Sequence, residues 1–330
     1  MKTHRPTTIG YNTENKHFIF GDCAVTPSGK IILPSSDGII TINGHSFNIA
    51  KNHPKTYPNT ETPLLFPYLK TTTNKQKIIE NLTHPSPRHQ LTSTTAVTLS
   101  RFLTDTTALV GKTQSLLLTF TILAYPLTPL IREKSATKLG IWIHGQKASG
   151  KNTLARVLMQ MAGFPDYSHI TFSKHPNTQQ KTSQKINKSS NHFHIIPTTP
   201  SPITIITSET TLDKSARSRF ISVESNPSKQ GLSPSQQKFR LESLLAIAPE
   251  LHTITRWIMM NLPEFTDKAE HFMEVWLNND EIQKELGGRI TTTYAAIYAA
   301  ACAINQMLFQ ESITSPTALK SLFRNHLSKK

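Results

Sequence analysis

The amino-acid sequence predicts an α/β fold in which a parallel sheet is built around one glycine-flanked loop. Apolar runs of strand length recur across residues 139–224, and polar or proline-containing segments separate them. Apolar residues at helical spacing fill most of residues 93–131 and 239–328 on either side. The first apolar run of the central part leads directly through the loop into a helical pattern. Strands interspersed with helices favour a parallel sheet over an all-β architecture.

The first half of the chain divides into three segments before this core. In residues 1–60, the short apolar runs HFIF, KIILP, GIITI and HSFNI alternate with turn sequences such as Asn43-Gly44, which predicts a small β-rich region. Residues 61–92 are rich in Pro, Thr, Asn and Lys with little periodicity and are expected to form a linker. Residues 93–138 are expected to form a helical block that packs against the core.

The loop has the spacing of a phosphate-binding loop. In the segment LGIWIHGQKASGKNTLARVL, Gly145 precedes Gly150-Lys151 at the interval that lets backbone N–H groups turn inward around phosphate oxygens. Lys151 is expected to reach the β- and γ-phosphates, and a helix that begins near Ser149 adds its partial positive charge. The alternative interpretation is an ordinary strand–turn–helix. The expected nucleotide-binding residues are Gly145, Gln146, Lys147, Ala148, Ser149, Gly150, Lys151, Asn152 and Thr153.

The residue after the loop lysine departs from the usual pattern. Ser or Thr normally follows the lysine and binds Mg²⁺, whereas this chain has Asn152 there and a hydroxyl one residue later, at Thr153. An amide oxygen can bind a hard cation but is a weaker ligand. Asn152 and Thr153 are therefore the expected metal ligands, with ATP and Mg²⁺ as the expected cofactors. A second Gly-Lys-Thr at residues 111–113 lacks an upstream glycine and a preceding strand, and predicts a helix boundary.

The predicted core spans residues 139–224 and the predicted lid follows it. Further strands are expected at 169–173, 192–196, 203–207 and 219–224. Residues 225–238, rich in Pro, Ser and Gln, are expected to be a linker, and residues 239–330 a C-terminal helical lid. Trp257 and Trp276 fall on apolar helix faces, so they are expected to lie in the core.

The charge of the chain favours a polyanionic partner. The formal net charge is +15 and the pI is about 9.8, which favours DNA or RNA; the alternative is a basic protein that is merely soluble.

Two cysteines, Cys23 and Cys302, suggest no disulfide framework and favour a reducing, cytoplasmic location. The apolar stretch at 115–131 is interrupted by Pro126 and Pro129, which predicts a buried helix rather than a membrane span.

The order of these elements resembles the AAA+ class of P-loop NTPases over about residues 93–310. The loop, the strand ending in Thr207-Ser208-Glu209, and Arg217-Ser218-Arg219-Phe220 before the last strand and lid carry the resemblance. The chain is most similar to superfamily-3 and minichromosome-maintenance-like helicase domains of plasmids, prophages and genomic islands. The resemblance implies that Ser208 or Thr207 senses the γ-phosphate. It also implies a homo-oligomeric ring, expected to be a hexamer, in which Arg219, or Arg217 in its place, acts on the neighbouring subunit's ATP. The alternative for this arginine is a surface residue that starts a strand.

The acidic residues that this class uses for hydrolysis are missing from the expected third strand. That strand, residues 191–196, contains no Asp or Glu, and Asp166 is the single carboxylate between Lys151 and Pro202. Glu209 and the more distant Asp213 follow the fourth strand. Either ATP is hydrolysed poorly, or Glu209 compensates from the adjacent strand.

Two further features lie in the polar part of the core. His192 and His194 alternate on a strand but have no nearby Cys or carboxylate to complete a metal site, so a structural or solvent-facing pair is favoured. The lysines at 174, 181, 185 and 188 are candidates for DNA contact, and the alternative is a solvated loop.

The sequence as a whole predicts an ATP-binding, DNA-acting, helicase-like protein of mobile-element DNA replication that binds single- or double-stranded DNA. Whether it is also an ATP hydrolase is left open by the missing acidic residues of the third strand. One alternative is a degenerate nucleotide-binding scaffold or regulator with weak or no hydrolysis. Another is a basic nucleic-acid-binding module with a vestigial loop.

Overall fold

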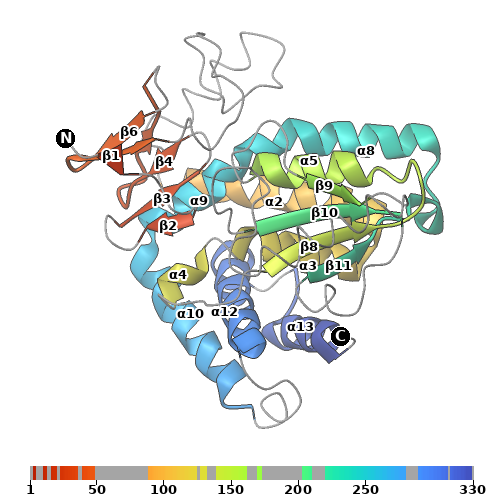
Figure 1. The fold of residues 1–330 in the computed structure, drawn as a ribbon. Helices are drawn as coiled ribbons and strands as arrows, with labels where there is room; N and C mark the ends of the chain where they lie inside the picture. Colours follow the sequence, from red (N-terminus) through yellow and green to blue (C-terminus); the bar gives the residue numbers. More distant parts are fainter. Residues whose placement is uncertain are drawn as a thin grey trace.

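The computed structural model of the 330-residue chain describes residues 3–4, 10–12, 16–20, 23–35, 39–48, 88–124, 127–131, 139–161, 169–172, 203–209, 220–279, 289–310 and 313–328. These residues form helices together with a parallel four-stranded sheet, which agrees with the α/β class (Figure 1). The linker predicted at 61–92 lies outside the described residues up to residue 87.

The parallel sheet consists of β8 (Leu139–His144), β9 (His169–Phe172), β10 (Ile203–Ser208) and β11 (Phe220–Glu224). Its order is β11-β8-β10-β9, so the chain continues to one side of β8 and then returns to its other side. The register pairs His144 with both Ser208 and Glu224, which aligns the carboxyl ends of three strands at one edge. A crevice at such a reversal of strand order is where open α/β sheets bind ligands. The strands expected at 169–173, 203–207 and 219–224 are confirmed to within one residue, and 192–196 lies outside the described residues.

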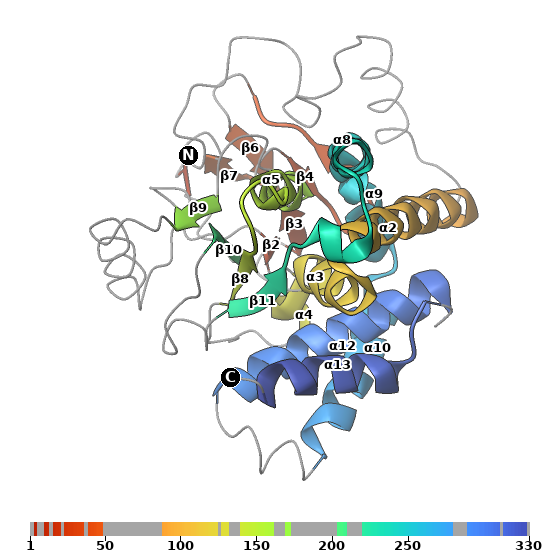
Figure 2. The ribbon, with the colours of Figure 1, turned by 90° about the vertical axis from the view of Figure 1, so that its right-hand side faces the viewer.

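Helices cover both faces of this sheet (Figure 2). α5 (Lys151–Met161) packs on β8, β9 and β10, while α3 (Lys112–Ala124) contacts β11. The sheet residues between these helices are fully buried: Ile141, Ile143, Ile205, Ile221 and Val223. β-branched residues fit this position because both faces of a parallel sheet are covered.

The helical block before β8 is divided by a glycine. α2 (Arg88–Val110) ends at Gly111, whose φ of +84° suits a residue without Cβ, and α3 begins directly after it. This confirms the helix boundary expected at residues 111–113. α3 is buried from Leu117 to Ala124, which confirms the prediction of a buried helix, and the short α4 (Thr128–Ile131) follows it. None of the described helices is both long and apolar enough to cross a membrane.

The segment after β11 is helical earlier than its composition predicts. Part of the linker expected at 225–238 is the 3-10 turn η3 (Pro227–Gln230) and the first turn of α8 (Pro234–Ile247). α8 begins here because Ser233 and Gln236 form a reciprocal capping box. Tertiary packing on α2 and α5 then holds the helix in place.

The remaining helices form the C-terminal part of the molecule. They are η4 (Ala248–Glu250), α9 (Leu251–Met260), α10 (Leu262–Leu277), α12 (Arg289–Phe309) and α13 (Pro316–Ser328). α12 is buried continuously from Tyr294 to Asn305 because α10, α3 and α13 all pack against it. Trp257 and Trp276 are buried, so their expected place in the core is confirmed.

The described residues before residue 50 include seven short strands. β2 (Gly10–Asn12), β3 (His17–Ile19), β4 (Ala24–Val25) and β5 (Ile31–Ile32) pair antiparallel in chain order. β1 (Thr3–His4), β7 (His45–Asn48) and β6 (Ile39–Ile42) form a second small sheet. β3 and β4 contact α9, and β2 contacts α4.

Candidate functional site

The loop between β8 and α5 has a backbone that its glycines make possible. Gly145 has φ +148°, and a Cβ there would lie 2.2 Å from the carbonyl oxygen of Ser225. Gly150 has φ +83°, and a Cβ there would lie 2.9 Å from Leu241 Cδ1 on α8. Ala148, between them, is also left-handed at φ +64°. The glycine spacing is therefore required by the close approach of β11 and α8 to the loop.

Hydrogen bonds fix this loop to the strands on both sides. The Gly145 N–H donates to the Ser208 carbonyl over 3.3 Å, which extends the β8–β10 ladder by one residue. The Ser225 N–H donates to the His144 carbonyl over 2.7 Å, and the Ser225 hydroxyl donates to the Ser149 carbonyl over 2.7 Å. The loop is thus held by β10 and by the end of β11 at once.

Lys151 places its ammonium group inside the loop. The residue is only 7% exposed, and Nζ donates to the carbonyls of Gly145, over 2.9 Å, and Gln146. The Ser149 hydroxyl lies 3.4 Å from Nζ. Burial lowers the pKa of Lys151, and the negative charge of Glu209 opposes this shift. Because Lys151 is also the first residue of α5, a cation and a helix N-terminus meet at one point.

A cleft of about 940 Å³ opens beside the loop and lies between it and α8. Its volume is within the range of small-molecule sites. Gln237 of α8 donates from Nε2 to the Ala148 carbonyl over 3.0 Å, so the two walls of the cleft touch. The cleft is lined by Lys147, Ala148, Ser149, Gly150, Lys151, Asn152, Thr153, Thr207, Ser208, Glu209, Pro234, Gln237, Lys238, Leu241, Glu242 and Leu245.

The side chains expected to bind metal lie at the start of α5. Asn152 is exposed, and its Oδ1 accepts a hydrogen bond from the Thr207 hydroxyl over 2.8 Å. Thr153 is half-buried on the same turn. Over the described part of the chain, no three His, Cys, Asp or Glu side chains cluster as a metal site. A cation here would take at most a few protein oxygens, so its other ligands would be phosphate and water.

Two of the sequence-predicted residues, Ser208 and Glu209, lie at the end of β10 beside the cleft, but their side chains have different surroundings. Ser208 is buried, and its hydroxyl accepts a hydrogen bond from Trp142 Nε1 over 2.7 Å. Glu209 is exposed at the end of the strand and lines the cleft. The structure therefore brings Lys151, Thr207 and Glu209 to one cleft, while the Ser208 hydroxyl is turned toward Trp142 in the sheet.

Several predicted residues lie outside the described part of the chain. These are Asp166, His192, His194, Asp213, Arg217 and Arg219, together with the lysines at 174, 181, 185 and 188.

The contribution of α8 to the cleft was not anticipated from the sequence. Gln237 and Lys238 fell within the expected linker, and Leu241, Glu242 and Leu245 within the expected lid. The Ser233-Pro234-Ser235-Gln236 sequence is a capping-box signal and would have located the start of the helix. Nothing in the sequence indicates that this helix lies against the loop.

Comparisons with protein-family models, with curated proteins and with solved structures gave no match.

Proposed function

We propose that the cleft between the loop and α8 binds ATP, with the phosphates on residues 145–153. The observation that carries this proposal is the position of the Lys151 ammonium, which is buried in a glycine-built loop at the first turn of a helix. Among the described residues this buried cation bonds to carbonyl and hydroxyl oxygens, and these hydrogen-bond partners carry no formal counter-charge. A phosphate group would supply that charge.

The surroundings of the loop also favour a phosphate ligand. The cleft lies at the carboxyl edge of a parallel sheet, beside the point where strand order reverses. On binding, Lys151 exchanges its bonds to the Gly145 and Gln146 carbonyls for bonds to the β- and γ-phosphates. Mg²⁺ would bridge those phosphates, with Asn152 and Thr153 as candidate protein ligands and Glu209 nearby.

The larger proposal is a DNA-acting, helicase-like ATPase of AAA+ type that assembles as a homo-oligomeric ring. It is supported by the order of elements, by Thr207 facing the loop helix, and by the net charge of +15. In this proposal Thr207 is the better candidate for sensing the γ-phosphate, because its hydroxyl already contacts the first turn of α5. Arg219 or Arg217 would act on the ATP of a neighbouring subunit.

A second candidate function is nucleotide binding without efficient hydrolysis, as in a scaffold or regulator. The observation that favours it is the pairing of Thr207 with Asn152, because this bond uses the amide oxygen that would otherwise bind the metal. The carboxylates that line the cleft in the described part of the chain are Glu209 and Glu242. Hydrolysis in this site would depend on one of them to orient water.

Titration with a fluorescent ATP analogue, with and without Mg²⁺, tests the binding proposal. We expect Lys151→Ala to abolish binding in a folded protein, and the control Lys112→Ala, an exposed lysine of α3 that does not line the cleft, to retain it. Equal affinity for wild type and Lys151→Ala would exclude the loop as the phosphate site. Steady-state hydrolysis with single-stranded DNA then separates the ATPase from the scaffold, since a scaffold binds ATP but does not turn it over.

A further inference from the structure

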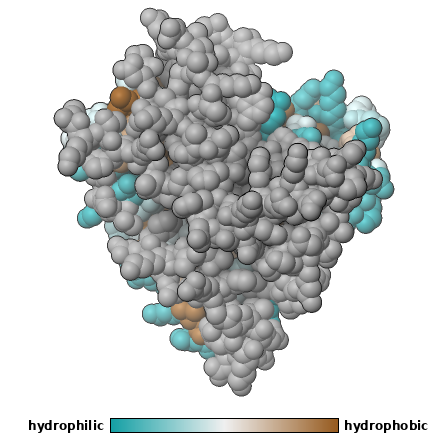
Figure 3. Space-filling view, in the orientation of Figure 1, coloured by the Kyte–Doolittle hydropathy of each residue, from teal (hydrophilic) through white to brown (hydrophobic). Residues whose placement is uncertain are grey.

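A second cavity, of about 650 Å³, lies between α2 and α8, on a different side of α8 from the loop cleft. We call it the α2–α8 groove and define it by Val97, Arg101, Asp105, Phe239, Arg240 and Ser243. Figure 3 shows hydrophilic residues on the part of the surface over α8, the helix that carries half of these side chains.

The groove presents apolar side chains to solvent. Val97 is 68% exposed and Phe239 is 63% exposed, the highest values among the large apolar residues of the described chain. Most large apolar side chains of the described residues are buried, including the neighbours Leu241 and Leu244 on α8. An aromatic ring that is exposed in this way has at least one face open to a ligand.

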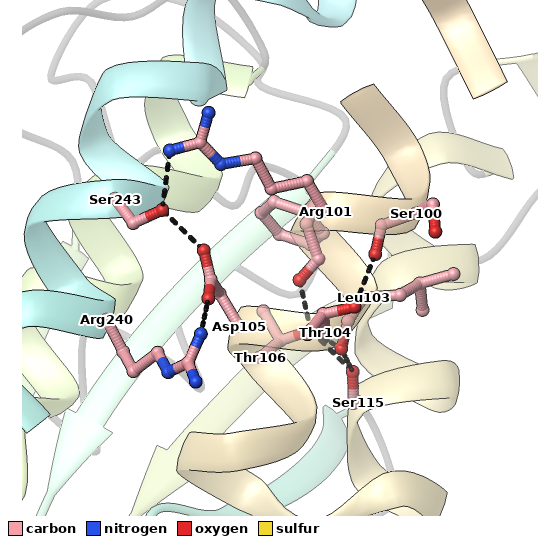
Figure 4. Close-up of polar contacts among 10 residues, drawn as sticks. Ser100, Arg101, Leu103, Thr104, Asp105, Thr106, Ser115, Arg240 and Ser243 are labelled. Atoms are coloured by element: carbon pink, nitrogen blue, oxygen red, sulfur yellow. Dashed lines mark hydrogen bonds and ion pairs between the residues drawn. The ribbon is translucent and has the colours of Figure 1, made fainter. Parts of the chain in front are cut away.

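Two arginines stand beside these apolar side chains in fixed positions. Arg240 donates from Nη1 to Asp105 Oδ1 over 2.7 Å, and the Ser243 hydroxyl donates to Asp105 Oδ2 over 2.6 Å (Figure 4). Arg101 donates from Nη2 to the Ser243 hydroxyl over 3.1 Å. The side chain of Asp105 is 3% exposed, so one buried carboxylate orients both guanidinium groups directly or through Ser243.

The guanidinium groups keep donors for a ligand. Each Arg carries five N–H donors, and the bonds formed within the described residues use one nitrogen of Arg101 and one of Arg240. The Arg240 guanidinium also lies 5.9 Å from the centroid of the Phe239 ring. Aromatic and cationic groups are therefore side by side and already ordered.

This combination distinguishes between the possible ligands. An apolar protein segment would cover Phe239 and Val97, but it would also bury the Arg101 guanidinium, whose hydrogen-bond partner among the described residues is the Ser243 hydroxyl and not a carboxylate, together with the remaining N–H donors of Arg240, which is costly. A single nucleic-acid strand offers a base face for Phe239 and phosphates for Arg101 and Arg240. Asp105 is the single carboxylate among the described residues that line the groove, and it is already paired, so it does not repel a phosphate strongly.

We propose that the α2–α8 groove binds single-stranded nucleic acid, with a base stacked on Phe239 and the adjacent phosphates beside Arg101 and Arg240. The proposal rests on the DNA-acting part of the proposed function. It does not depend on nucleotide binding at Lys151, because the two cavities are lined by different residues.

Fluorescence anisotropy with a labelled oligothymidylate of about 15 nucleotides, in low salt and without nucleotide, tests the groove. Phe239→Ala is expected to weaken binding at least about fivefold, and Phe239→Trp to retain it, because base stacking needs an aromatic face. Arg101→Gln is expected to weaken binding. It should also reduce the slope of log K against log salt concentration by about the amount of one phosphate contact. The controls are Val275→Ala, an exposed apolar residue of α10, and Lys112→Gln, an exposed cation of α3.

The outcomes separate the groove from the rest of the proposed function. If wild type binds and Phe239→Ala binds equally well, the groove is not the site, although the protein still binds DNA. If the two controls weaken binding as much as Phe239→Ala and Arg101→Gln, the contact is a general charge effect and the groove proposal fails. If wild type does not bind at low salt, the DNA-acting function fails as well, whatever the ATP titration shows. If Phe239→Ala instead dissociates an oligomer seen by light scattering and leaves DNA affinity unchanged, the groove is a protein interface.

Discussion

Thr207 donates a hydrogen bond to Asn152 Oδ1 over 2.8 Å and so connects the end of β10 to the first turn of α5. The next residue, Ser208, turns to the other face of the sheet and accepts a hydrogen bond from Trp142. Successive side chains of a strand point to opposite faces, so one of these two hydroxyls faces the loop helix. A ligand that contacts Asn152 would therefore be coupled to β10 through Thr207.

The first prediction separates these two hydroxyls. Thr207→Val removes the hydroxyl that faces the loop but keeps the branched shape. If Thr207 senses the γ-phosphate, we expect ATP turnover to fall about a hundredfold with little change in ATP affinity. Ser208→Ala is the matched control, which removes the acceptor for Trp142 and should lower the free energy of unfolding by about 1–3 kcal/mol while turnover is retained. The opposite pattern, with turnover lost in Ser208→Ala, would transfer the role to Ser208.

The second prediction concerns the backbone of the loop. Gly145→Ala would place a methyl group 2.2 Å from the Ser225 carbonyl oxygen, so the loop or the end of β11 must move. We expect loss of ATP binding and a lower midpoint of chemical unfolding. Gly231→Ala is the control, because it has φ +74° but nothing within 4 Å of the added Cβ, so its cost is limited to about 1 kcal/mol. Equal ATP affinity in wild type and Gly145→Ala would show that ATP binding does not need the close contact between the Gly145 backbone and the Ser225 carbonyl.

The third prediction concerns pH. Burial lowers the pKa of Lys151 below its ordinary value of 10.5, so between the two values the unfolded chain binds more protons than the folded protein. The free energy of unfolding of the ligand-free protein therefore rises with pH between the folded pKa and 10.5. This gain is lost again as pH falls through the folded pKa. Lys151→Met should remove this contribution, measured as the difference in free energy of unfolding at several alkaline pH values.

ATP binding should have the opposite dependence on pH. Phosphates favour the charged form of Lys151, so ATP affinity should fall as pH rises through the folded pKa. Calorimetry in buffers of different ionisation enthalpy should then detect proton uptake on binding in this range. Binding without proton uptake throughout the range would mean that Lys151 does not pair with the phosphates.

The sequence predicts the parts of the site that depend on local spacing. Gly145, Gly150 and Lys151 lie within seven residues, and their types and spacing predict a loop with positive φ angles between a strand and a helix, as the structure has it. The strands were also predictable, since buried β-branched runs such as Ile203–Thr207 have a strong local signal.

The other wall of the cleft depends on contacts between distant residues. Leu241 packs against Gly150, and Gln237 donates to Ala148, across about ninety positions in the chain. Local composition favoured a linker at 225–238, but the packing of α8 on α2 and α5 determines where this segment lies. Similarly, Trp142 has the character of a core residue, and its bond to Ser208 becomes visible only when β8 and β10 are paired.

The fourth prediction concerns the attachment of α8 to α2. Asp105→Ala would leave Arg240 and Ser243 without their buried acceptor. We expect the free energy of unfolding to fall by about 1–3 kcal/mol, which is less than for a fully buried pair because the Arg240 side chain is 36% exposed. ATP affinity should fall as well, since α8 carries Gln237 against the loop. Glu242→Gln, which breaks the exposed pair with Lys238, is the stability control and should cost less than about 0.5 kcal/mol. If the free energy of unfolding falls by the expected amount but the ATP affinity of Asp105→Ala is unchanged, α8 does not shape the site.

The last prediction concerns assembly and follows from the direction of β11. Phe220 starts this strand and pairs with Gly140, whereas the loop begins five residues further along β8, at Gly145, about 16 Å away. Arg219 directly precedes Phe220 in the chain, so an arginine finger at this position is expected to act on ATP held by a neighbouring subunit.

Mixing inactive variants tests this arrangement. Lys151→Ala and Arg219→Ala should each lack ATPase activity, but mixed rings contain interfaces that pair an intact loop with an intact arginine, so partial activity should return. Arg217→Ala mixed with Lys151→Ala tests the substitute position in the same way. Rings that form from the mixture but stay inactive would exclude an arginine that acts in trans. A wild-type protein that remains monomeric with ATP and DNA would favour the scaffold function, because a finger supplied by a neighbour requires an assembled interface.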